Sequence, residues 1–102
     1  DGDPAAGIIS TASDLLKFGE ALFTNQILSE ESLAEMKITT CDFGLGMESW
    51  VTEEGNSGYG KNGSSLGVDA NLIYFPENET AIVIFSNFGG GNYKQVIDEI
   101  LE

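Results

Sequence analysis

Four strand-like segments between residues 43 and 86 constrain this fold more than any other feature, because only short turn signals separate them. The turn signals are residues 53–58, Gly67 and residues 76–79, which are rich in Gly, Asn, Ser and Pro. Strands joined by such short connections pair in antiparallel fashion, since a parallel connection needs a dozen or more residues. We therefore expect residues 43–87 to form one antiparallel sheet of about four strands.

The strand segments differ in their apolar pattern. Residues 43–51 alternate apolar and other side chains, which is typical of a half-buried strand, and residues 59–64 follow as its hairpin partner. Val68–Phe75 and Thr80–Ser86 form a second hairpin. The last segment is apolar without interruption from Ala81 to Phe85, so we expect it to be covered on both faces and central in the complete sheet.

Helical patterns flank the predicted sheet. Thr11 with Asp14 three residues later resembles a capping box, and a second helix is expected from Ser29 to about Lys37. The stripe of the first helix consists of Leu15, Phe18, Gly19 and Leu22.

Residues 1–42 are thus a helical segment, 43–87 the sheet and 93–102 a C-terminal helix. The order α-α-β-β-β-β-α predicts an α+β fold with helices packed on the sheet.

Length and charge limit the possible functions. A chain of 102 residues supports one modest core, and we expect residues 1–102 to be a single, partial domain of a longer protein. The net charge of -13 opposes binding to nucleic acid or an anionic membrane surface. The acidic residues are scattered, which is typical of a solvated surface. No run approaches the roughly 20 apolar residues of a membrane span.

The chain has no His and a single cysteine, Cys41. This composition excludes a disulfide within the chain, the common zinc sites and every Ser-His or Cys-His mechanism. Acidic loops show no recognisable metal-ligand spacing, so no metal or cofactor is expected. Cys41 is expected to be a small buried residue, and Phe43, Trp50 and Tyr59 are expected to pack rather than bind a ligand.

Three stretches carry a family resemblance when they are taken together. They are residues 5–15 (AAGIISTASDL), 43–47 (FGLGM) and 60–67 (GKNGSSLG), followed by 72–77 (LIYFPE) and a strand that ends at Ser86. In this order they resemble the last third of a class C β-lactamase-related serine hydrolase, of the penicillin-binding protein type. The resemblance covers nearly the whole chain and implies part of a β-lactamase/transpeptidase-like fold.

The family's catalytic motifs are only partly present. The resemblance implies a Ser-x-x-Lys nucleophile motif, a Tyr-x-Asn or Ser-x-Asn motif, and a Lys-Thr-Gly or His-x-Gly triplet on a strand. Only the triplet has a counterpart, Lys61-Asn62-Gly63, because no Ser in the chain is followed three positions later by Lys. We expect the catalytic residues to lie upstream, in an exported or cell-envelope parent enzyme of the β-lactamase, D-Ala-D-Ala carboxypeptidase or esterase type, and the chain alone to be inactive.

The resemblance assigns substrate-binding roles to Lys61, Asn62, Gly63 and Ser64. Lys61 would anchor a small carboxylated substrate, and the backbone N–H of Ser64 would be one half of the oxyanion hole. Gly63 would keep the strand bare, so that the substrate docks like an added strand. Asn62 replaces the usual Thr or Ser, so a peptide, an ester or another carboxylated substrate is an alternative to a β-lactam.

The resemblance also implies a fifth strand beside the last one. We therefore expect Thr80–Ser86 to be an apolar edge that pairs with the missing N-terminal part of the parent domain or with a second copy of the chain. An alternative function is a non-catalytic, acidic protein-interaction module that uses this edge or the stripe Leu15, Phe18 and Leu22.

Overall fold

The computed structural model describes residues 7–88 and 93–102, and it confirms the α+β fold. Ala5 and Ala6 of the first family-like stretch and the three consecutive glycines after Phe88 lie outside the described residues. The elements are α1 (Ala12–Phe23), α2 (Glu30–Lys37), β1 (Glu48–Val51), β2 (Ser57–Ser65), β3 (Val68–Phe75), the short 3-10 helix η1 (Pro76–Asn78), β4 (Thr80–Ser86) and α3 (Tyr93–Leu101).

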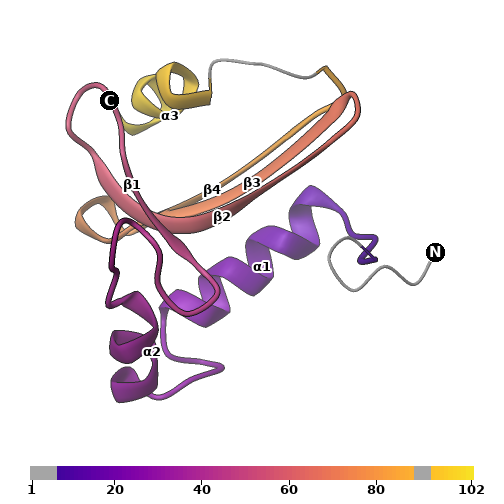
Figure 1. The fold of residues 1–102 in the computed structure, drawn as a ribbon. Coiled ribbons are helices and arrows are strands. Elements are labelled where there is room, and N and C mark those ends of the chain that lie inside the picture. Colours follow the sequence, from indigo (N-terminus) through magenta and orange to yellow (C-terminus); the bar gives the residue numbers. More distant parts are fainter. Residues whose placement is uncertain (1–6, 89–92) are drawn as a thin grey trace.

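The sheet is an antiparallel meander in the order β1-β2-β3-β4. Figure 1 shows α1 and α2 on one side of this sheet and α3 on the other. The molecule therefore has three layers, with the sheet in the middle.

Both predicted helix starts are confirmed. The Thr11 hydroxyl accepts a hydrogen bond from the Asp14 N–H at 3.1 Å, and the Ser29 hydroxyl accepts one from the Ser32 N–H at 3.1 Å. Each bond satisfies a backbone donor that has no partner within the helix. Local sequence thus determines where α1 and α2 begin.

Each face of the sheet has its own apolar cluster. On the α1 and α2 side the buried members are Leu22, Phe23, Leu33 and Met47. Tyr74 stacks on Phe23 there, with ring centroids 4.8 Å apart. On the α3 side the buried members are Ile73, Phe75, Ile82 and Ile97. The sheet is therefore packed on both faces. Of the stripe predicted for the first helix, Gly19 and Leu22 are buried, whereas Phe18 is 49% exposed.

The strand expected from residue 43 begins only at Glu48, so this prediction was wrong for residues 43–47. The chain turns here instead: Asp42 and Gly46 have φ values of 70° and 74°, and the Gly44 N–H donates to the Met47 carbonyl. Of the apolar residues in the alternating pattern, Met47 is buried in the core, whereas Phe43 is 63% exposed. Periodicity alone does not distinguish such a loop from a strand.

Two expectations about single residues in this region were also wrong. Cys41 is exposed, because it lies in the turn with a φ of 52°, and Phe43 does not pack in the core. Trp50 and Tyr59 are partly buried and pack against the two apolar clusters, as expected. The turn therefore keeps Cys41 and Phe43 out of the sheet, whereas Trp50 and Tyr59 lie in it.

β4 lies at the edge of the sheet and pairs only with β3 among the described strands. Its Ile82 contacts the α3 cluster, and α1 lies against the other face, so both faces are partly covered. A central position in a longer sheet stays a prediction. Within the residues that the structure describes, no helix is both long and apolar enough to cross a bilayer.

Candidate functional site

The four predicted site residues lie together in the second half of β2. Lys61, Asn62, Gly63 and Ser64 are all exposed and pair with β3 at Leu72, Asn71, Ala70 and Asp69. β1 pairs with β2 only as far as Gly60. No described strand therefore pairs with residues 61–64 on the β1 side, and we call these residues the open edge of β2.

Two of the three glycines of β2, Gly60 and Gly63, have opposite surroundings. A Cβ at Gly60 would lie 2.0 Å from the Leu72 carbonyl oxygen, so the sheet itself requires glycine there. A Cβ at Gly63 would have no atom within 4 Å. Packing within the described chain therefore gives no reason for glycine at position 63.

Lys61 forms an ion pair that the sequence pattern does not identify. Its Nζ donates to Oε1 of Glu48 at 2.7 Å. The lysine side chain is 58% exposed, whereas that of Glu48 is 18% exposed. The ammonium group is thus accessible from solvent while its carboxylate partner lies beneath it. The hairpin register is the signal that could have found Glu48, because β1 places it opposite Gly60.

The Ser64 hydroxyl is bound to the neighbouring strand β3, although Ser64 is exposed. It donates to Oδ1 of Asp69 at 2.5 Å, and the Tyr93 hydroxyl donates to Oδ2 of the same carboxylate at 2.7 Å. Tyr93 comes from α3, so nothing in the local sequence around Ser64 predicts its involvement. Ser64 thus binds Asp69 through its side chain, while β1 does not reach the Ser64 backbone.

A buried carboxylate fixes the β1–β2 turn to α3. Asp98 accepts hydrogen bonds from the Asn56 side chain at 2.8 Å and from the Glu54 N–H at 3.4 Å. Burial raises the pKa of Asp98, but the hydrogen bonds from Thr52, Asn56 and the Glu54 backbone outweigh it, so the pKa lies below its ordinary value. The turn that aligns β1 with β2 is therefore held by a charged group.

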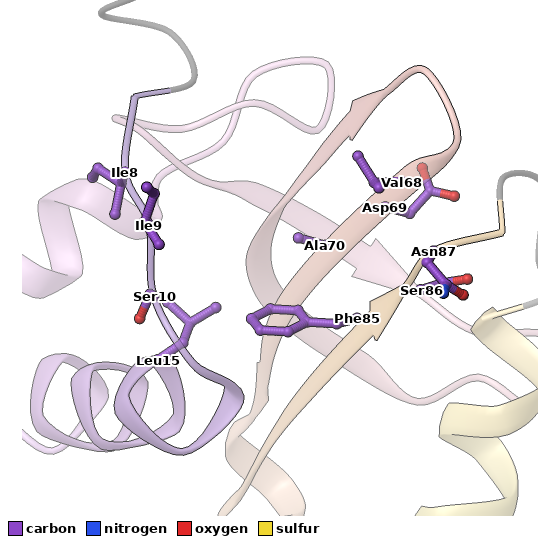
Figure 2. A pocket seen from close by; sticks show the side chains of 10 residues that line it. All are labelled: Ile8, Ile9, Ser10, Leu15, Val68, Asp69, Ala70, Phe85, Ser86 and Asn87. Atoms are coloured by element: carbon purple, nitrogen blue, oxygen red, sulfur yellow. The ribbon is translucent and has the colours of Figure 1, made fainter. Parts of the chain in front are cut away.

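An apolar hollow of about 890 Å³ opens between the first turn of α1, the start of β3 and the end of β4 (Figure 2). The Phe85 ring extends from β4 toward Leu15 of α1 in this view. The other apolar residues that line the hollow are Ile8, Ile9, Val68 and Ala70. Because Ala70 pairs with Gly63, the hollow begins one strand away from the open edge of β2. No group of three or more potential metal ligands occurs among residues 7–88 and 93–102.

Comparisons with known proteins bear on both the fold and the family. No curated protein sequence gives a significant match. The fold is similar to the crystal structure of a penicillin binding protein from Bacillus halodurans, with a TM-score of 0.72 and 23% sequence identity. The similarity covers 90% of this chain but only 31% of that one, and at this identity it shows the fold alone. The family model described as Beta-lactamase matches residues 1–101. The chain therefore belongs to the Beta-lactamase family.

Proposed function

We propose that the open edge of β2 is the substrate-binding and oxyanion-stabilising wall of a serine hydrolase that acts on a peptide, a β-lactam or an ester. One observation carries this proposal. Residues 61–64 are a strand edge that β1 leaves unpaired, and the space beside Gly63 is empty. An unpaired edge with an unobstructed glycine accepts an extended ligand as an additional strand.

The chemistry follows from the requirements of acyl transfer. Attack on the substrate carbonyl places negative charge on its oxygen, and backbone N–H groups aimed at that oxygen stabilise the transition state. The Ser64 N–H would be one such donor, since Ser64 lies on the part of β2 that β1 leaves unpaired. Lys61 would supply a cationic hydrogen-bond donor at the start of the same edge.

The nucleophile is proposed to come from residues outside 1–102. The chain contains no Ser-x-x-Lys motif and no His, so it holds neither of the usual pairs that activate a serine. The chain spans 31% of the similar penicillin binding protein. On this proposal residues 1–102 alone form no acyl-enzyme, whereas the full-length protein does.

Covalent labelling tests this division of roles. The 102-residue chain and the full-length protein are each incubated with a labelled penicillin and with a reactive ester, and adducts are located by mass spectrometry. We expect a labelled Ser only in the full-length protein and only outside these residues. A label on any Ser of residues 1–102 would contradict the proposal.

The remainder of the parent domain is the proposed occupant of the apolar hollow and the β4 edge. Ile8 and Ile9 are more than 90% exposed, and Phe85 is 45% exposed at the same hollow. Exposed apolar patches of this kind mark an interface. The same surface would serve the alternative function, a non-catalytic protein-interaction module, for which the labelling experiment should give no adduct in the full-length protein.

A further inference from the structure

Glu48 lies close enough to the open edge of β2 to change the charge that a substrate meets there. Its carboxylate accepts from Lys61 at 2.7 Å and is far less exposed than the lysine. A ligand that reaches the ammonium from solvent therefore finds a group whose positive charge is already paired.

Backbone contacts on both sides set the position of Glu48. It pairs with Gly60 of β2 and forms an isolated bridge with Phe43. The hairpin to which it belongs is tied to α3 through Asn56 and Asp98. Because its main chain is fixed in this way, Glu48 stays beside Lys61 without depending on the mobility of a loop.

The surroundings of the open edge are acidic rather than basic. Lys61 contributes one positive charge, whereas Glu48 and Asp69 contribute two negative charges, in a chain whose net charge is -13. The hydroxyl groups of Ser64 and Tyr93 already donate to Asp69. A substrate carboxylate would therefore meet a compensated ammonium group and a repulsive field.

We propose that Glu48 is a specificity-determining residue that makes the site prefer uncharged acyl substrates, such as simple esters and amides, to substrates that carry a free carboxylate. This inference rests on the proposed function, in which the open edge binds the substrate. An ammonium group has three N–H donors, and one of them is used by Glu48. The others suit a neutral carbonyl acceptor, which brings no charge to be repelled.

Two esters of matched length test the proposal in the full-length protein. The substrates are 4-nitrophenyl butyrate and 4-nitrophenyl hemisuccinate, which differ by a terminal carboxylate. Glu48→Gln should raise kcat/KM for the hemisuccinate roughly threefold to fivefold, the effect expected for one partly exposed ion pair. The value for the butyrate should change by less than about twofold, because a neutral chain does not sense the lost charge. The gain should shrink as salt rises to about 0.5 M.

Glu77→Gln is the matched control. It removes the same charge from η1, at the opposite end of β3 from Val68 and Asp69, and Glu77 is exposed. The ratio of the two kcat/KM values should stay at its wild-type value in this variant. An equal rise in both variants would assign the effect to net charge and overturn the role of Glu48.

A binding measurement separates the two levels of the proposal. Backbone amide shifts of residues 61–64 are followed by NMR during titration with N-acetyl-D-alanine and with its amide. If the amide binds more tightly than the acid, and Glu48→Gln reduces this preference, the inference is supported. It is supported even if neither ester is hydrolysed, because the lack of hydrolysis would refute the proposed reaction alone. Hydrolysis of both esters with an unchanged ratio in Glu48→Gln overturns the inference and leaves the reaction intact. Equal affinities, or no shifts with either ligand, also overturn it.

Discussion

Gly60 and Gly63 lie three positions apart in β2 and have different surroundings. At Gly60 a methyl group would collide with the backbone of β3, whereas at Gly63 it would meet open space. The first glycine serves the sheet. The second has no structural reason within the described chain, which is consistent with a ligand that approaches the strand at that point.

The substitution Gly63→Ala should therefore separate stability from activity. Alanine fits the site and lowers the conformational entropy of the unfolded chain. The free energy of unfolding should therefore stay equal or rise by up to about 1 kcal/mol. In the full-length protein kcat/KM should fall roughly tenfold or more, because the methyl group displaces the substrate from the edge. Thermal unfolding and steady-state kinetics check both values.

Gly60→Ala is the contrasting variant. The collision with Leu72 should destabilise the fold by about 1–3 kcal/mol, as overpacking does in other cores. If Gly63→Ala retained full activity, or lost stability as Gly60→Ala is expected to, the open edge of β2 would not be a binding site.

At the scale of elements, the β1–β2 hairpin depends on a contact with the last helix. Asp98 of α3 receives donors from the Asn56 side chain and the Glu54 backbone, and Thr52 beside them is buried. This contact holds the turn that follows β1 and so supports the register that places Glu48 opposite Gly60, whereas the open edge of β2 lies beyond the other end of β1. α3 thus acts on the site without contributing a residue to the open edge itself.

The stability of the hairpin should depend on pH through Asp98. Its pKa is lower in the folded chain than its ordinary value of 3.8, so the charged form favours folding. The contribution is complete above the ordinary pKa and is lost as the pH falls through the lower, folded-state pKa. Asp98→Asn should therefore reduce the free energy of unfolding at pH 7, and the difference from wild type should vanish at acidic pH below both pKa values.

Denaturant unfolding across the acidic range measures this difference. Glu99→Gln is the control, since Glu99 is the exposed neighbour of Asp98 in α3. The control should remain close to wild type at every pH. A deficit of Asp98→Asn that was the same at neutral and acidic pH would show that the charge of Asp98 does not contribute.

At the scale of the whole molecule, the side of the chain that carries β4 is poorly covered. The hollow beside α1 exposes apolar side chains, and among the described strands β4 has a neighbour on one side only. Edges of this kind pair with other strands unless something covers them. Since the chain spans 31% of the similar penicillin binding protein, the remainder of the parent domain is the cover that we propose.

Residues 1–102 in isolation should therefore associate. Sedimentation velocity should show species above the monomer mass of 10.9 kDa, increasing with protein concentration. Phe85→Lys places a charge in the hollow and should shift the equilibrium toward the monomer. Leu66→Lys adds the same charge at a fully exposed turn outside the hollow and should leave association unchanged. A monomer at all concentrations would show that the edge needs no partner.

Local chemistry was enough to determine much of this protein from its sequence. Thr11 and Ser29 begin helices because their hydroxyls cap nearby backbone donors. Gly67 and residues 76–79 reverse the chain, so the two strands Val68–Phe75 and Thr80–Ser86 have the predicted bounds. The family also follows from the sequence, since each stretch that carries the resemblance is continuous and the stretches stand in the order of the family.

Only the tertiary structure decided which groups meet at the site. Glu48 reaches Lys61 because the strand starts five residues later than its alternating pattern predicts, at a turn with left-handed backbone. Tyr93 and Asp98 act on β2 and its turn from a helix distant in sequence. Such contacts depend on strand register and helix packing, and these are set by the energy of the whole fold. No short window of sequence contains that information.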